Sequence, residues 1–130
     1  MLVNNFLDES ALKFPNKEAL IFEQKRVTYQ QLQIATNSFA NALISNGFKR
    51  QDVGLIYLDN SDELVISLFG ILKASGIFVS INPLITPKRL LYMLNDCQAK
   101  TLITNSKNLI KIKEILQTLL TNEKNLLYYY

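Results

Sequence analysis

The chain of 130 residues has no histidine, no tryptophan and a single cysteine, Cys97. Without histidine there is no imidazole base to activate a serine or cysteine nucleophile, and no histidine-ligated zinc. One cysteine forms neither an internal disulfide nor a cysteine-cluster metal site, so we expect Cys97 to be a small buried apolar residue. No basic segment followed by an apolar core opens the sequence, which favours a cytoplasmic protein.

Glycine is also scarce, and its four positions, Gly47, Gly54, Gly70 and Gly76, are isolated from one another. A phosphate-binding turn needs clustered glycines whose backbone donors wrap the anion, so the sequence carries neither a dinucleotide fingerprint nor a Walker-type loop. Gly47 and Gly76 each follow an apolar helical pattern. We interpret both as helix stops.

Long apolar runs and concentrated charge are missing as well. The longest apolar tract, residues 64–72, is interrupted by Lys73 well short of the roughly 20 residues that cross a bilayer, so we expect no membrane span. The net charge of +3 is spread along the chain and predicts no nucleic-acid partner. Lys107, Lys111 and Lys113 form the nearest approach to a patch. We interpret them as the solvated side of a helix, with a membrane-surface helix as the weaker alternative.

What is present is the composition of a folded protein, with 48% hydrophobic residues in a chain long enough for one domain, residues 1–130. Helical and strand patterns alternate from about Thr28 onward, which predicts an α/β fold with helices laid on a parallel sheet by right-handed crossovers. Thr28 to Gln31 has the form of a capping box, and Thr86-Pro87 that of an N-cap followed by proline. Helices are expected over residues 1–14, 28–47, 62–72 and 86–94 and from 105 or 106 onward, strands over 52–58, 77–81 and 101–104, and a hairpin from 19–22 and 26–28.

Few side chains are candidates for chemistry. Asp59 follows a predicted parallel strand, at the edge where open α/β sheets bind ligands, although a loop or cap role is the simpler interpretation. The neighbouring pairs Asp8-Glu9 and Asp62-Glu63 point in different directions on a helix and favour helix ends over catalysis. Lys73 lies in the last turn of an apolar helix, where the helix dipole stabilises a cation; a phosphate ligand is the less favoured alternative.

Several spaced motifs resemble those of the adenylate-forming superfamily, which contains acyl-CoA synthetases, nonribosomal peptide synthetase adenylation domains and luciferases. The resemblance covers residues 1 to about 106; residues 107–130 are the last helix and an atypical tail that ends in Tyr128-Tyr129-Tyr130. The matching segments are Phe14-Pro15-Asn16-Lys17-Glu18-Ala19-Leu20-Ile21, Val27-Thr28-Tyr29-Gln30-Gln31-Leu32, Leu72-Lys73-Ala74-Ser75-Gly76-Ile77-Phe78-Val79, Asn82-Pro83-Leu84, Thr86-Pro87 and Leu94-Asn95-Asp96-Cys97-Gln98-Ala99-Lys100.

The resemblance implies the N-terminal subdomain of that enzyme fold, with three layers, a partly built and mostly parallel sheet, and a short N-terminal hairpin. In such enzymes a carboxylate attacks the α-phosphorus of ATP, and a thiol of coenzyme A or of a carrier protein then takes the acyl group. The family's phosphate loop, adenine pocket, ribose-binding Asp, magnesium site and mobile Lys match no residue here. We therefore expect no catalytic, cofactor-binding or metal-binding residue in this chain; ATP and Mg²⁺ belong to the full-length family.

These observations predict an N-terminal portion of a carboxylic acid-activating ligase that is not catalytic alone. Its partner would then be the remainder of the ligase. One alternative is a non-catalytic module that docks on a complementary ligase fragment or a carrier-linked partner, using exposed apolar surface and the tyrosine tail. Another is the product of a decayed gene.

Overall fold

The computed structural model of the protein describes residues 1–121 and 127–129, and side chains as far as residue 117. The described residues form five helices and six strands, and each predicted helix and strand is among them. In chain order they are α1 (Val3–Lys13), β1 (Glu18–Phe22), β2 (Lys25–Thr28), α2 (Tyr29–Ser45), β3 (Val53–Tyr57), α3 (Asp62–Lys73), β4 (Ile77–Ser80), α4 (Pro87–Asp96), β5 (Thr101–Thr104), α5 (Ser106–Thr121) and β6 (Leu127–Tyr129).

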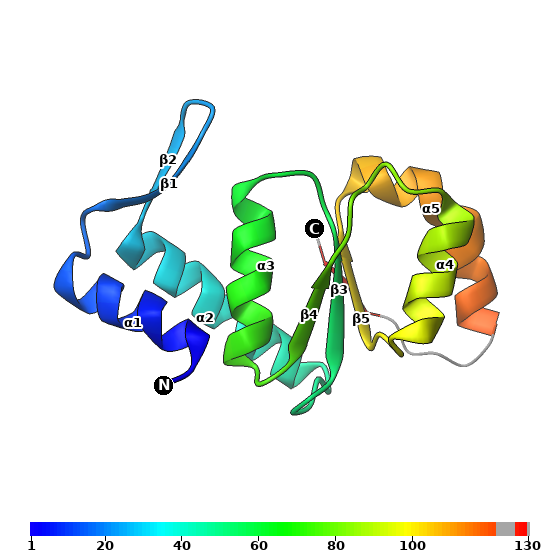
Figure 1. The fold of residues 1–130 in the computed structure, drawn as a ribbon, viewed down its shortest axis with the longest axis horizontal. Helices are drawn as coiled ribbons and strands as arrows, with labels where there is room; N and C mark the ends of the chain where they lie inside the picture. Colours follow the sequence, from blue (N-terminus) through cyan, green and yellow to red (C-terminus); the bar gives the residue numbers. More distant parts are fainter. Residues whose placement is uncertain (122–126, 130) are drawn as a thin grey trace.

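Four parallel strands form the main sheet, in the order β4-β3-β5-β6, and β1 and β2 form a separate antiparallel hairpin (Figure 1). The strand β6 was not predicted: Leu127–Tyr129 was assigned to an atypical tail, and its backbone instead pairs with β5. Tyr130 lies outside the described residues. The fold is α/β, as the sequence predicts, with a mostly parallel sheet and a short N-terminal hairpin.

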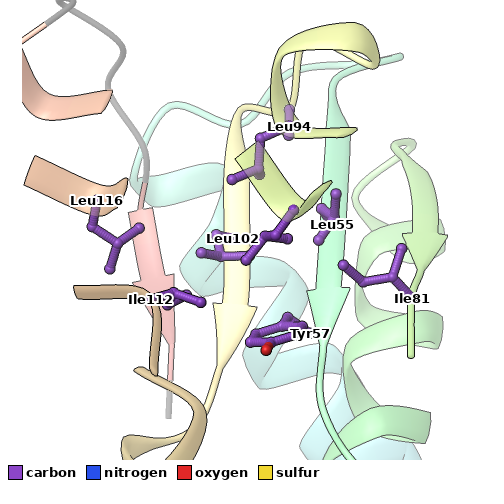
Figure 2. Close-up of a cluster of buried hydrophobic side chains, with 9 residues drawn as sticks. Leu55, Tyr57, Ile81, Leu94, Leu102, Ile112 and Leu116 are labelled. Carbon is purple, nitrogen blue, oxygen red and sulfur yellow. The ribbon is translucent and has the colours of Figure 1, made fainter. Parts of the chain in front are cut away.

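The central strand β3 is buried on both faces, which explains why its sequence is a continuous apolar run. Leu55 and Tyr57 pack with Leu102 of β5 against α4 and α5, as Figure 2 shows for this cluster. Ile56 and Ile103 point to the opposite face, where they pack against α2 and α3. Because successive side chains of a strand alternate between faces, β3 and β5 contribute to a hydrophobic core on each face of the sheet. The sheet and the helices on its two faces form three layers.

Local capping signals fix the helix starts where the sequence places them. The Thr28 hydroxyl accepts from the Gln31 backbone N–H at 3.2 Å, and the Gln31 side chain accepts from the Thr28 N–H at 2.9 Å, which completes the predicted capping box. Ser61 accepts from the Leu64 N–H at the start of α3. Thr86 accepts from the Arg89 N–H at the start of α4, with Pro87 in the first turn. Each contact satisfies a donor that the helix itself leaves unpaired.

The helix α3 is less covered than its sequence suggests. An almost entirely apolar helix was expected to be covered on several sides, and Ile71 and Gly70 are indeed buried, with Gly70 against the Phe39 ring of α2. Six further apolar side chains along the helix remain half-buried: Leu64, Val65, Ile66, Leu68, Phe69 and Leu72.

The two predicted helix stops differ in their cause. Gly47 has a φ of +91°, the left-handed conformation expected after α2. At the end of α3 the left-handed residue is Ser75, with a φ of +62°, one position before Gly76. Gly76 is required for space instead: a Cβ there would lie 3.0 Å from the backbone oxygen of Asp52 and would also meet the Phe48 ring.

Replacing Ser75 with glycine is expected to stabilise the protein. A side chain in the left-handed region costs about 1 kcal/mol, part of which is offset by the greater freedom of glycine in the unfolded chain. We predict a net gain of about 0.5 kcal/mol in the free energy of unfolding, measured by urea denaturation. Ser80→Gly, at an exposed position of β4 without a positive φ, is the matched control and should destabilise by a similar amount. Equal destabilisation by both changes would contradict the assignment.

A partly buried ion pair anchors the hairpin to α3. The ammonium of Lys25 on β2 donates to the carboxylate of Asp62 in the first turn of α3. The Asp62 side chain is only 7% exposed. Burial raises the pKa of Asp62, but the hydrogen bonds from Lys25, Glu63 and the backbone, together with the charge of Lys25, lower it more, so the net pKa lies below the usual 3.8. The same hydrogen bond raises the pKa of Lys25 above 10.5. Asp62 and Glu63 are therefore at a helix end, as predicted, and the partner of Asp62 is a lysine 37 residues away.

The Lys25–Asp62 pair should make stability fall at low pH. A carboxylate whose pKa is depressed in the folded state stabilises it fully above its unfolded pKa, near 3.8, and that contribution is lost as the pH falls through the folded value. Asp62→Asn should therefore cost about 1 to 2 kcal/mol at pH 6, and the difference from the parent should shrink below about pH 4.

The Arg26–Glu18 pair of the same hairpin supplies a control, because its side chains are 59% and 43% exposed. Glu18→Gln should change stability by less than about 0.5 kcal/mol at either pH. Urea denaturation at pH 3, 4 and 6 measures both variants. Parallel pH profiles for the parent and Asp62→Asn would contradict the role of the pair.

Candidate functional site

The topology selects one edge of the main sheet as the place for a ligand. From β3 the chain passes through α3 to β4 on one side, and from β4 it returns through α4 to β5 on the other side of β3. The order therefore reverses between β3 and β5, and in open α/β sheets ligands bind outside the carboxyl ends of such strands. Residues 58–60 and Asn105 follow the two strands at this edge.

Two hollows flank the segment that follows β3. The larger, about 440 Å³, lies between this segment and the loop after β4, and the smaller, about 230 Å³, lies beside the hairpin and the start of α5. Leu58, Asp59 and Asn60 line both. The larger is also lined by Leu64, Ser80, Ile81, Asn82, Pro83 and Leu84, and the smaller by Phe22, Ser61, Glu63 and Asn105.

Asp59, the candidate that the sequence singled out, lies at this edge. Its residue is exposed and borders both hollows, and its backbone oxygen accepts from the Ser61 hydroxyl at 3.0 Å, which shapes the turn into α3. No lysine or arginine is among the residues that line either hollow. The local charge at the carboxyl edge therefore comes from Asp59 and, in the smaller hollow, Glu63.

Tyr57 was not predicted to have a polar role. Its hydroxyl donates to the Pro83 backbone oxygen at 2.9 Å and so ties the loop after β4 to the end of β3. Burial raises the pKa of the Tyr57 phenol, and the charge of Asp59 raises it further. The residue therefore stays protonated and acts as a donor that shapes the larger hollow. In the sequence it is recognisable only as an aromatic residue near the end of an apolar run.

Two helices begin at this edge, and both N-termini are already occupied by the chain. Asn105 accepts from the Asn108 backbone N–H at 2.8 Å at the start of α5, and α3 carries Asp62 and Glu63 in its first turn. Carboxylates there complement the positive end of the helix dipole, which an anionic ligand would otherwise use. The Asn108 side chain, buried in α5, donates to the Tyr57 backbone oxygen at 3.4 Å and so couples the carboxyl end of β3 to α5.

Lys73 lies away from this edge. It ends α3, about 16 Å along the helix from its first residue. Its ammonium contacts the Asp8 carboxylate at 3.0 Å and donates to the Asn37 side chain at 2.7 Å, and its side chain is 8% exposed. It therefore joins α1, α2 and α3. This position does not fit the alternative that Lys73 binds phosphate. It fits the interpretation that the dipole of α3 stabilises the ammonium in the last turn of the helix.

The remaining candidates also lie outside the hollows. Asp8 additionally accepts from the Gln33 side chain at 3.3 Å, and Glu9 is exposed. Cys97 is half-buried and packs against the cluster of Leu55 and Tyr57, so it is less buried than expected. Lys107, Lys111 and Lys113 are exposed on α5, as predicted for a solvated face.

ATP and its magnesium ion, implied by the resemblance, do not fit the residues at this edge. A triphosphate needs cationic or backbone donors, whereas the hollows carry carboxylates and no lining cation. Within residues 1–121 and 127–129, no three His, Cys, Asp or Glu side chains are grouped so as to hold a metal ion. In the same part of the chain, no helix combines the length and apolar character needed to cross a membrane.

Comparison with known proteins identifies the family. The model of the AMP-binding enzyme family matches residues 7–129. Bacitracin synthase 1 of Bacillus licheniformis is 35% identical over 105 residues, which cover 81% of this chain and 2% of the synthase. A long-chain-fatty-acid–CoA ligase of Bacillus subtilis (strain 168) is 36% identical over 102 residues, which cover 78% of this chain and 18% of the ligase.

A solved structure places the match within a domain. The N-terminal subdomain of Klebsiella oxytoca NpsA, solved in complex with 3-hydroxyanthranilyl-AMSN, superposes with a TM-score of 0.75 at 28% identity, over 79% of this chain and 26% of that one. The chain thus spans a small part of the length of the relatives it matches. From the family match, the two relatives and the shared fold, we conclude that this chain belongs to the AMP-binding enzyme family and corresponds to its N-terminal region.

Proposed function

We propose that the chain contributes the N-terminal scaffold of an ATP-dependent ligase that activates a carboxylic acid as its acyl-adenylate, and that the chain alone does not catalyse this reaction. The family supports the first part of the proposal. The second part rests on one observation: the hollows at the carboxyl edge are bordered by Asp59 and by no lysine or arginine. Each phosphate charge brought there would meet a like charge.

Adenylate formation requires groups that hold two anions close together. Adenylate formation brings a carboxylate and a polyphosphate together, so its rate depends on positioning two anions and on stabilising the negative charge that develops. Loss of a single oriented donor from such a site costs about a hundredfold to a thousandfold in rate. Two cations that contact α3 have structural partners instead, Lys25 with Asp62 and Lys73 with Asp8.

The acceptor of the acyl group is expected to be a thiol of coenzyme A or of a carrier protein. A peptide synthase and a CoA ligase match this chain at nearly the same identity, 35% and 36%, so both acceptors stay open. Since the single cysteine needs no oxidising compartment, we also propose that the protein works in the cytoplasm.

A docking module is the second candidate, and the outer face of α1 favours it. Three apolar side chains at the start of the chain are largely exposed: Leu2 by 68%, Val3 by 60% and Phe6 by 59%. Such a group of apolar side chains on a surface is typical of an interface. On this alternative the chain binds a complementary ligase segment without contributing chemistry, and Phe6→Lys would weaken that complex.

Calorimetric titration of the purified chain with ATP and magnesium tests the proposal. Because no cation borders the hollows at the carboxyl edge, we expect no saturable heat of ATP binding at protein concentrations high enough to detect millimolar affinity. A complete ligase of the family, titrated in the same buffer, is the positive control. Saturable binding of ATP to the chain, with a stoichiometry near one, would contradict the proposal.

A further inference from the structure

Two buried polar atoms near the carboxyl end of β5 have no hydrogen-bond partner in the part of the chain that the structure describes. They are the hydroxyl oxygen of Thr104 and the side-chain oxygen of Asn108. Thr104 is 1% exposed and Asn108 0% exposed, so neither side chain reaches bulk solvent. Leaving such a group unsatisfied lowers stability, and folded proteins pair nearly all of them with protein groups or with ordered water.

The two side chains meet beside Tyr57. Thr104 pairs with Tyr57 in the parallel register of β3 and β5, so both point to the face of the sheet that α4 and α5 cover. Figure 2 shows Tyr57 on this face with Leu102, two residues before Thr104. Asn108 comes to the same place from α5, because its side-chain nitrogen lies 3.4 Å from the Tyr57 backbone oxygen. The two unsatisfied atoms thus share a neighbour and belong to different elements.

The hydrogen-bonding capacity of both groups defines what would fit between them. The Tyr57 backbone oxygen only accepts, so the Asn108 amide nitrogen must face it, and the amide oxygen faces elsewhere and needs a donor. The Thr104 hydroxyl offers one donor and also accepts. Since neither oxygen has a partner among the described residues, the two side chains are not bonded to each other. A small neutral molecule that both donates and accepts would satisfy both.

We propose that one ordered water molecule binds between Thr104 and Asn108 and bridges β5 to α5. The water donates to the Asn108 side-chain oxygen and accepts from the Thr104 hydroxyl, which satisfies both buried atoms at once. Polar sites of this kind are where buried water is found in folded proteins. An ion fits less well, because a hydroxyl and an amide supply no charge to balance it.

The bridge supports one wall of the candidate site. Asn105 follows Thr104, accepts from the Asn108 backbone N–H and lines the smaller hollow, so solvent comes within one residue of the proposed water. Together with the contact between Asn108 and Tyr57, the water joins the carboxyl ends of β3 and β5 to the first turn of α5. The inference does not depend on the proposed function, because it concerns the folded chain without nucleotide.

A crystal structure of the chain, at a resolution that shows ordered water, tests the inference directly. The expected result is a water peak within about 3.2 Å of both the Thr104 hydroxyl and the Asn108 side-chain oxygen. The same crystals grown from Thr104→Val should lack the peak. A direct hydrogen bond between the two side chains, or no density between them, would overturn the inference.

Urea denaturation distinguishes a water-bound hydroxyl from one that is merely buried. Thr104→Val keeps the shape of the side chain but removes one partner of the water, so the equilibrium constant for unfolding should rise about tenfold. Thr101→Val is the matched control. Thr101 is also fully buried on β5, and its hydroxyl also has no partner among the described residues, but it points to the opposite face of the sheet from Thr104.

Removing the Thr101 hydroxyl should leave the unfolding constant unchanged or lower it, because a lone buried hydroxyl costs stability. A lower constant for Thr104→Val, or an equal change in both variants, would overturn the inference. Should Thr104→Val fail to fold, the crystal structure of the parent chain decides.

Discussion

The burial of β3 on both faces is the constraint on which the rest of the structure depends. Leu55, Ile56 and Tyr57 are almost completely excluded from solvent, and they pack alternately against α4 with α5 and against α2 with α3. A strand covered on two sides fixes the order of its parallel neighbours and sends each connecting helix to one face. It also determines that Asp59 and Asn60 emerge together at the carboxyl edge.

Two lysines that contact α3 join elements of the fold. Lys73 links α3 to α1 and α2, and Lys25 links the hairpin to the first turn of α3. The edge where a ligand would bind is left with Asp59 and Glu63 and with two helix starts whose donors the chain itself satisfies. The lysines that contact α3 therefore lie in structural ion pairs, and no cation borders the two hollows.

The sequence predicts what depends on neighbouring residues. The caps at Thr28 and Thr86 and the buried run of β3 are readable because their signals lie within a few positions. The Lys25–Asp62 pair, the Tyr57–Pro83 hydrogen bond and the two hollows depend on side chains brought together over 20 or more positions, and no local pattern contains them. At the end of α3 the left-handed residue is Ser75, and the need for glycine at position 76 comes from the nearness of Phe48 and Asp52, which no local pattern contains. The sequence did not predict β6 because a strand of three residues is too short to show an alternating or continuous apolar pattern.

Release of pyrophosphate by the purified chain tests the central claim most directly, namely that these residues build a scaffold without the means to hold a triphosphate. The measurement supplies ATP, magnesium and a mixture of carboxylic acids and follows pyrophosphate against a blank without protein, in a preparation shown to be free of full-length ligase. The account predicts release no faster than in the blank. Acid-dependent release above the blank, in proportion to the concentration of this chain, would contradict it.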